Sequence, residues 1–348
     1  MEIHDQYAEM RRQWMETDDD TELQKFFKTD EYRDMSYIER NRGFLTNSKC
    51  RIHSQDEWWF KLMYVDEIPQ PYALDTQIEA LLLGSCLDDL RTHGREYITQ
   101  KYEVMSRTVS NIEDAIQETL MDIEKQKDKV SKRDGSRLQS GIDREKELYE
   151  HIAFLNNLKG KKQLTNSQWQ MVLQMDGEFS QNALFRQKPE KMIIIFKIGN
   201  IPCKVELDDY DPHFTNDETG AQDFHAIIDM KSTASITTFD PVGYLEQFEF
   251  YQMAIEMRTF KNEPVWDSRP ICAIAETVDK HGLWSRSQAY YYSPERLKDA
   301  RAPIMQKLQK CWNSVKTNRF YKSKEFLPDC PYYGYEGYGR ATKFLLVP

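Results

Sequence analysis

The sequence predicts a mixed α/β (α+β) fold, in which a mixed central sheet is flanked by helices and a helical insertion precedes the core strands. Apolar residues at helical spacing dominate the first half of the chain, and a cluster of short apolar runs typical of strands follows. The chain then returns to a helix, two strands and a helix. With 348 residues, 40% of them hydrophobic, it is long enough to bury such a core.

The first half is predicted to be largely helical. Residues 1–40 hold twelve acidic and six basic residues and are expected to form an acidic helical arm. Leucines and isoleucines at near-helical spacing predict a helix over 75–93. The charged segment 105–158 is predicted to form a helical hairpin whose turn lies at Asp134-Gly135. Thr165 is predicted to cap the N-terminus of a further helix.

Near residue 191 the spacing of the apolar residues changes from the period of a helix to that of strands. Five segments are predicted to be strands: 192–198, 202–208, 225–230, 271–276 and 287–292. Helices are predicted over 241–258 and 294–317, and residues 209–224 are predicted to be a long polar connection.

These elements suggest three regions. We expect the acidic arm at 1–40, a core domain at 41–320 with its helical insertion at about 105–185, and a tail at 321–348 rich in Tyr, Gly and Pro. No apolar run is long enough to cross a bilayer, and the first residues lack a secretory signal, so a cytoplasmic protein without membrane contact is expected. The six cysteines form no C-x-x-C pair and are expected to be free buried thiols.

The charge is unevenly spread. A net charge of −10 excludes a uniformly basic nucleic-acid binder but not a local basic segment. Residues 298–324 hold eight basic residues and one acidic residue, and a second basic stretch lies at 125–133. Each is either a track for DNA phosphates or a solvated helix face.

Two predicted strands end in acidic residues. Asp208 ends one strand, and Asp229, Met230 and Lys231 end another, where alternation places Asp229 and Lys231 on the same side. If the two strands pair, Asp208 lies beside Asp229. Converging carboxylates need a hard, oxygen-seeking cation such as Mg²⁺ between them. A neighbouring lysine suits a site that orients water and stabilises charge on a phosphate.

At these residues the chain resembles the PD-(D/E)XK nuclease superfamily, in particular its RecB-like, RecE-like and lambda-exonuclease-type phage exonucleases. Asp208 matches the acidic residue of the family's second core strand, and Asp229-Met230-Lys231 matches its D/E-x-K motif. Gln247 and Tyr251 match a downstream helix with the pattern Q-x-x-x-Y.

An upstream motif matches less closely. The family carries G-x-x-x-(H/E) on a helix, and here Gly84 is followed at that spacing by Asp88. Asp88 departs from the family's His or Glu but can still ligate a metal. The resemblance covers about residues 45 to 310.

The resemblance implies a Mg²⁺-dependent exonuclease, with Mn²⁺ as a substitute. It would resect linear double-stranded DNA ends, 5′→3′, for phage-type homologous recombination by strand annealing. Asp208, Asp229 and the Met230 carbonyl would hold one metal ion, with Asp88 as a further ligand, and Lys231 would position or help to deprotonate the attacking water. Gln247 and Tyr251 would support Lys231 or contact the substrate strand.

The implied partners are double-stranded DNA ends, a single-strand annealing protein and further copies of the chain in a homo-oligomeric ring, in the host cytoplasm if the protein is phage-encoded. Two alternatives stay open. The same fold serves structure-specific and restriction-type endonucleases, and a chain with a decayed site would be a non-catalytic DNA-binding protein.

Overall fold

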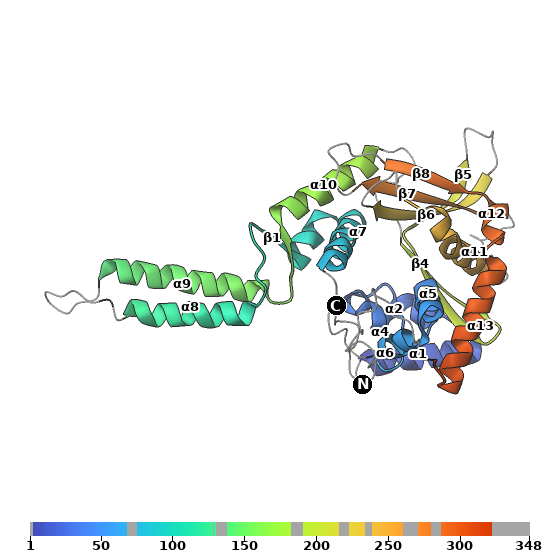
Figure 1. Ribbon diagram of the computed structural model, residues 1–348, viewed down its shortest axis with the longest axis horizontal. Helices are drawn as coiled ribbons and strands as arrows, with labels where there is room; N and C mark the ends of the chain where they lie inside the picture. Colours follow the sequence, from blue (N-terminus) through green and yellow to red (C-terminus); the bar gives the residue numbers. More distant parts are fainter. Residues whose placement is uncertain are drawn as a thin grey trace, which may run out of the picture. The chain divides into compact units, whose positions relative to one another are not determined.

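The computed structural model describes residues 3–67, 75–127, 129, 138–181, 191–215, 223–233, 239–259, 271–279 and 287–321. The chain divides into two compact units (Figure 1), one made of residues 1–80, 189–279 and 286–348 and the other of residues 81–188 and 280–285. The mixed α/β class is confirmed, with a largely helical chain and small mixed sheets. The predicted insertion at 105–185 lies within the second unit, and the boundaries predicted at 40 and 320 stay predictions.

The acidic N-terminal segment packs into the first unit. Its helices are α1 (Ile3–Thr17), α2 (Thr21–Phe26), α3 (Asp30–Asp34) and α4 (Tyr37–Arg40). Their apolar side chains form one buried cluster with Phe44 and with Ile195 of β3 (Met192–Ile198), and Trp14 at its centre is only 1% exposed. The segment therefore combines an acidic composition with an apolar core.

Two short helices then lead to the sheet. Thr46 caps α5 (Asn47–Gln55), and Asp56 caps α6 (Glu57–Tyr64) by accepting from two backbone N–H groups at 2.7 and 2.9 Å. Just before them, the Leu45 N–H donates to the Pro202 carbonyl at 2.8 Å. This bridge fixes the start of α5 against β4 (Ile201–Leu207).

The strands of the first unit form two sheets. β3 pairs with β4 in an antiparallel hairpin. The larger sheet has the order β5-β6-β7-β8, in which only β6 and β7 run parallel. Its strands are β5 (Asp209–Thr215), β6 (Asp223–Thr233), β7 (Ile271–Asp279) and β8 (Ser287–Tyr292). The predicted strands at 192–198 and 287–292 have the predicted bounds, and the other three agree within three residues.

The prediction of a polar connection at 209–224 is wrong at its start, because residues 209–215 form β5. This strand lies at the edge of its sheet and contains Pro212, which an edge strand tolerates because it need not donate on both sides. A register shift between Asp211 and Phe214 interrupts its pairing further. Because the sequence of this strand is polar and irregular, the alternation of apolar and polar residues does not predict it.

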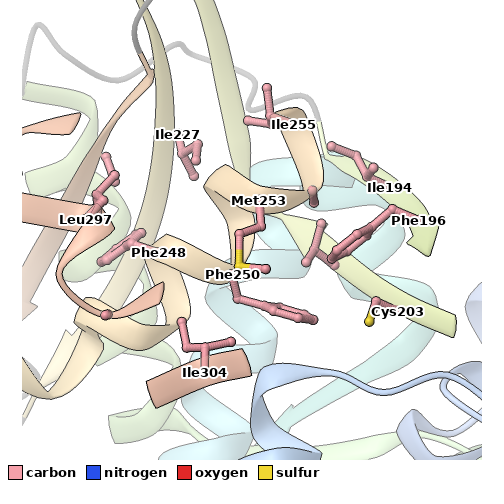
Figure 2. Close-up of a cluster of buried hydrophobic side chains, with 14 of the residues drawn as sticks. Ile194, Phe196, Cys203, Ile227, Phe248, Phe250, Met253, Ile255, Leu297 and Ile304 are labelled. Atoms are coloured by element: carbon pink, nitrogen blue, oxygen red, sulfur yellow. The ribbon is translucent and has the colours of Figure 1, made fainter. Parts of the chain in front are cut away.

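Helix α11 (Leu245–Thr259) lies at the centre of the first unit and follows a 3-10 turn at Val242–Tyr244. It packs against β3, β4, β6 and β7 and also against α12 (Pro294–Lys298) and α13 (Arg301–Thr317) (Figure 1). Figure 2 shows Phe248, Phe250 and Met253 of α11 among side chains from these strands and helices. Because α11 is buried on several sides, its polar residues are held firmly against the sheet.

The second unit contains the predicted helical hairpin. Its elements are α7 (Asp75–Lys101) from residue 81 on, β1 (Tyr102–Met105), α8 (Ile112–Lys127), α9 (Gln139–Leu158), β2 (Lys162–Thr165) and α10 (Asn166–Gln181). β1 and β2 pair in parallel. The predicted cap is confirmed, since Thr165 Oγ1 accepts from the Gln168 N–H at 3.2 Å. The turn predicted at Asp134-Gly135 lies outside the described residues.

Three other expectations concern the cysteines, membrane-spanning helices and the helix predicted at 294–317. The five cysteines in the described part of the chain are free and buried, as predicted, whereas Cys330 lies outside it. Among the described helices, none combines the length and the apolar character that crossing a membrane requires. The predicted helix at 294–317 consists of α12 and α13, which are separate helices.

Candidate active site

The centre of the site is the bend between β4 and β5, where the chain passes from the small sheet to the large one. Asp208 occupies this bend. Asp209 pairs with Ile228 in the antiparallel ladder, so Asp208 lies level with Asp229 on β6. The Asp208 Oδ2 atom accepts a hydrogen bond from the Met230 N–H at 3.0 Å. Asp208 and Asp229 therefore lie side by side, but not through the pairing of the two predicted strands, because β4 pairs with β3 and it is β5 that pairs with β6.

The C-terminal half of β6 supplies the other charged groups. Asp229 is 1% exposed, and its Oδ2 atom forms an ion pair with the Lys231 ammonium group. The predicted placement of Asp229 and Lys231 on one face is confirmed by this contact. The N–H and C=O of a strand residue point to the same side, so the Met230 carbonyl faces the side on which its N–H meets Asp208.

The carboxylates repel each other. Burial and, to a lesser extent, the charge of Asp229 together raise the pKa of Asp208 to about 6, although Lys231 and Lys191 oppose the shift. Burial alone would lower the pKa of Lys231, but Asp229 and Asp208 outweigh it and the pKa is raised. The site thus holds two acids and an ammonium group in a poorly solvated place, where an added cation would stabilise both carboxylates.

Helix α11 contributes Gln247 and Tyr251, which share a face at i and i+4. Gln247 Nε2 donates to Asp229 Oδ1 at 3.3 Å and to the Tyr251 hydroxyl at 2.7 Å. Burial and the two nearby aspartates raise the pKa of Tyr251, so its hydroxyl stays neutral. Gln247 therefore contacts Asp229, whereas the sequence analysis expected it to support Lys231 or the substrate strand.

Asp88 lies on α7 in the second unit, whereas Asp208 and Asp229 belong to the first. Its neighbour Asp89 accepts from the Tyr102 hydroxyl at 2.7 Å and forms an ion pair with Lys101 at 3.0 Å. Asp89 thus stabilises its own unit, and the role of Asp88 as a metal ligand stays a prediction.

The oxygen donors around Asp208 and Asp229 suit a hard cation. Within the described ranges, no group of three or more His, Cys, Asp or Glu side chains converges in a way that could hold a metal. Asp208, Asp229 and the Met230 carbonyl nevertheless offer the oxygen atoms that Mg²⁺ prefers. Mg²⁺ is commonly held by one or two carboxylates, with water and substrate phosphate completing its coordination. These residues therefore fit Mg²⁺ better than a nitrogen- or sulfur-seeking metal.

Lys191 was missed as a site residue by the sequence analysis. It immediately precedes β3, and its charge acts on Asp208. The sequence does contain a signal for the position of Lys191. Gly199 and Asn200 form a two-residue turn, and this turn fixes the register of the β3–β4 hairpin. In that register Met192 pairs with Leu207, so Lys191 lies next to Asp208.

The basic segments are partly neutralised in the described residues. On α13, Arg301 pairs with Glu249 and Glu256, Lys307 with Glu246 at 2.6 Å and Lys310 with Glu57 at 2.8 Å. On α8, Lys125 pairs with Asp122 and Lys127 with Glu124. For the described residues of the two segments, these contacts favour helix faces over a phosphate track, whereas Lys132, Arg133, Lys322 and Lys324 lie outside the described residues.

Comparisons with known proteins give little further information. No protein-family model matches the chain, and no curated protein matches it. One solved structure with a similar backbone, from Eubacterium rectale, is described as a “putative exonuclease”. It aligns with a TM-score of 0.44 and 14% identity, over 86% of this chain and 96% of that chain. Similarity at this level does not identify the family or the activity of this chain.

Proposed function

We propose that this chain is a metal-dependent DNA exonuclease of the PD-(D/E)XK type that resects linear duplex ends. One observation supports the proposal above all others. Asp208, in the bend between β4 and β5, meets Asp229 and Lys231 of β6, and α11 adds Gln247 at hydrogen-bond distance from Asp229. An acid pair with an adjacent lysine is suited to phosphodiester hydrolysis.

In this proposal Mg²⁺, or Mn²⁺ in its place, is held by Asp208, Asp229 and the Met230 carbonyl. When bound, the ion would stabilise charge on the phosphate and lower the pKa of a water molecule. The two carboxylates hold the binding position because β5 and β6 are paired just beyond it.

Lys231 acts as an ammonium group, because Asp229 and Asp208 favour its charged form. It orients the phosphate and the attacking water and stabilises negative charge that develops during hydrolysis. Gln247 is a positioning residue: it holds one Asp229 oxygen and is itself fixed by Tyr251. The 5′→3′ polarity, the homo-oligomeric ring and the single-strand annealing partner follow from the family resemblance and belong to the same proposal.

The direct test offers the protein linear duplex DNA and covalently closed circular DNA, each with Mg²⁺ and with EDTA. We expect Mg²⁺-dependent degradation of the linear DNA and none of the circle. Cleavage of the circle would instead identify an endonuclease. Binding to DNA without metal-dependent cleavage of either substrate would identify a non-catalytic DNA-binding protein.

A further inference from the structure

Three aromatic side chains lie beside the site and have no role in the hydrolysis proposed above. The rings of Phe239 and Tyr244 are stacked, with centroids 5.0 Å apart and planes inclined by 12°. The Tyr290 ring lies 5.0 Å from Phe239 at an inclination of 32°. These three residues, named here the aromatic cluster, come from the segment before α11 and from β8.

The aromatic cluster adjoins the charged groups of the site. The Lys231 ammonium nitrogen lies 5.4 Å from the centroid of the Tyr244 ring, which is within cation–π range. On the sheet, Asp229 pairs with Ala275, and Ala275 pairs with Tyr290. Paired residues share a face, so Tyr290 and Asp229 project from the same side of the sheet with only an alanine methyl group between them.

The aromatic cluster packs against the main hydrophobic core but is not fully covered by it. Phe248, which packs against the same sheet, is 0% exposed, whereas all three rings of the cluster are partly exposed. The neighbouring Val242 is 62% exposed. An apolar, partly open surface thus lies next to the ammonium group of Lys231.

We propose that the aromatic cluster stacks a nucleobase of the strand whose phosphate lies at Lys231. The inference rests on the proposed function and names a binding surface for it. A nucleotide carries its base and phosphate on one sugar, so a phosphate at Lys231 brings the attached base toward the aromatic cluster. The base must be unpaired to present its face, and stacking is tolerant of sequence because every base has a π-face. The ligand class is therefore an unpaired nucleotide at a DNA end.

The test measures binding, not cleavage. Fluorescence anisotropy is recorded in EDTA with a tailed duplex whose terminal nucleotides are intact, and with duplexes in which one terminal nucleotide at a time is abasic. Stacking contributes about 1–3 kcal/mol per base, so one abasic position should weaken binding to the wild type about five- to a hundredfold. Tyr290→Leu should weaken binding to the intact duplex by a similar factor. The abasic nucleotide that weakens binding to the wild type should then weaken binding to this variant no further.

Two variants serve as controls. Tyr290→Phe keeps the ring and should bind as the wild type does. Tyr291 is 44% exposed and lies on the opposite face of β8, so Tyr291→Leu should retain the full abasic effect. An equal abasic effect in the wild type and in Tyr290→Leu would overturn this inference alone. Failure of the wild type to bind the intact duplex both in EDTA and with Ca²⁺ in place of Mg²⁺ would overturn the proposed function with it.

Discussion

Asp208 and Asp229 are held together by backbone geometry despite their mutual repulsion. The bend after β4 and the Met230 N–H keep the Asp208 carboxylate in place while burial removes the water that would solvate it. Such an arrangement is costly unless a cation is bound. Removing one of the two carboxylates should therefore weaken metal binding.

Asp208→Asn should lower the affinity for Mg²⁺ at least about tenfold, since a ligand contributes no less than the outer-shell groups that support it. It should not lower the thermal stability of the metal-free protein, because it removes a repulsion and leaves an oxygen to accept from Met230. Titration calorimetry and thermal unfolding in EDTA measure the two effects. Asp299→Asn, at an exposed position on the same unit, is the control. Unchanged Mg²⁺ affinity in Asp208→Asn would refute the assignment.

Glu249 is a buried acid on α11 outside the site. It is 0% exposed, and burial raises its pKa to about 7 although Arg301 opposes the shift. Because the native state holds this proton more tightly than the unfolded state, the stabilisation is present below about pH 4.5 and is lost as the pH rises through 7. The loss is up to about 3 kcal/mol in the free energy of unfolding.

Glu249→Gln should therefore flatten the dependence of the unfolding free energy on pH between 5 and 8. Urea unfolding at several pH values measures this dependence. Glu295→Gln, at an exposed position on α12, should leave the wild-type curve unchanged. A Glu249→Gln curve as steep as that of the wild type would contradict the assigned pKa.

At the scale of elements, the helices of residues 3–40 show that a segment of acidic composition can still have a buried apolar core. Trp14 is almost fully buried against Phe44, although the segment around it is acidic. Charge counting cannot distinguish an acidic arm from an acidic outer face, because both have the same composition. The apolar side chains that separate them are too sparse to give a clear period.

Trp14→Ala should reduce the free energy of unfolding by about 3–5 kcal/mol, the usual cost of removing a large buried aromatic side chain. Tyr37→Ala, at an exposed position in the same segment, should change it much less. Chemical denaturation of the two variants checks this. A Trp14→Ala effect as small as that of Tyr37→Ala would show that the segment contributes nothing to the fold.

Helix α13 offers a further prediction. Lys307 bonds both oxygens of Glu246 at 2.6 Å, so it is engaged in packing α13 against α11. Lys307→Glu should lower the thermal midpoint through repulsion of Glu246, while the slope of log Kd for DNA against log salt stays unchanged. A slope reduced by about one would instead assign Lys307 to a phosphate contact.

For the whole molecule, the sequence predicts features that depend on neighbouring residues better than it predicts contacts between distant segments. Strands such as 192–198 and the acid–lysine pattern at 229–231 are readable because period and chemistry lie within a few residues. The ion pairs that engage the basic residues of α13 join segments up to about 250 residues apart, such as Glu57 and Lys310, and no local pattern predicts them. Asp88 fits a motif by spacing alone and lies in the other unit.

The most direct test of the central claim is the single-turnover rate of Mg²⁺-dependent cleavage of linear duplex DNA by Lys231→Ala. If Lys231 stabilises charge during hydrolysis, this rate should fall about 10²–10³-fold relative to the wild type. Lys298→Ala, at an exposed position on α12, should cleave at the wild-type rate. Cleavage by Lys231→Ala at the wild-type rate would contradict the assignment of the site.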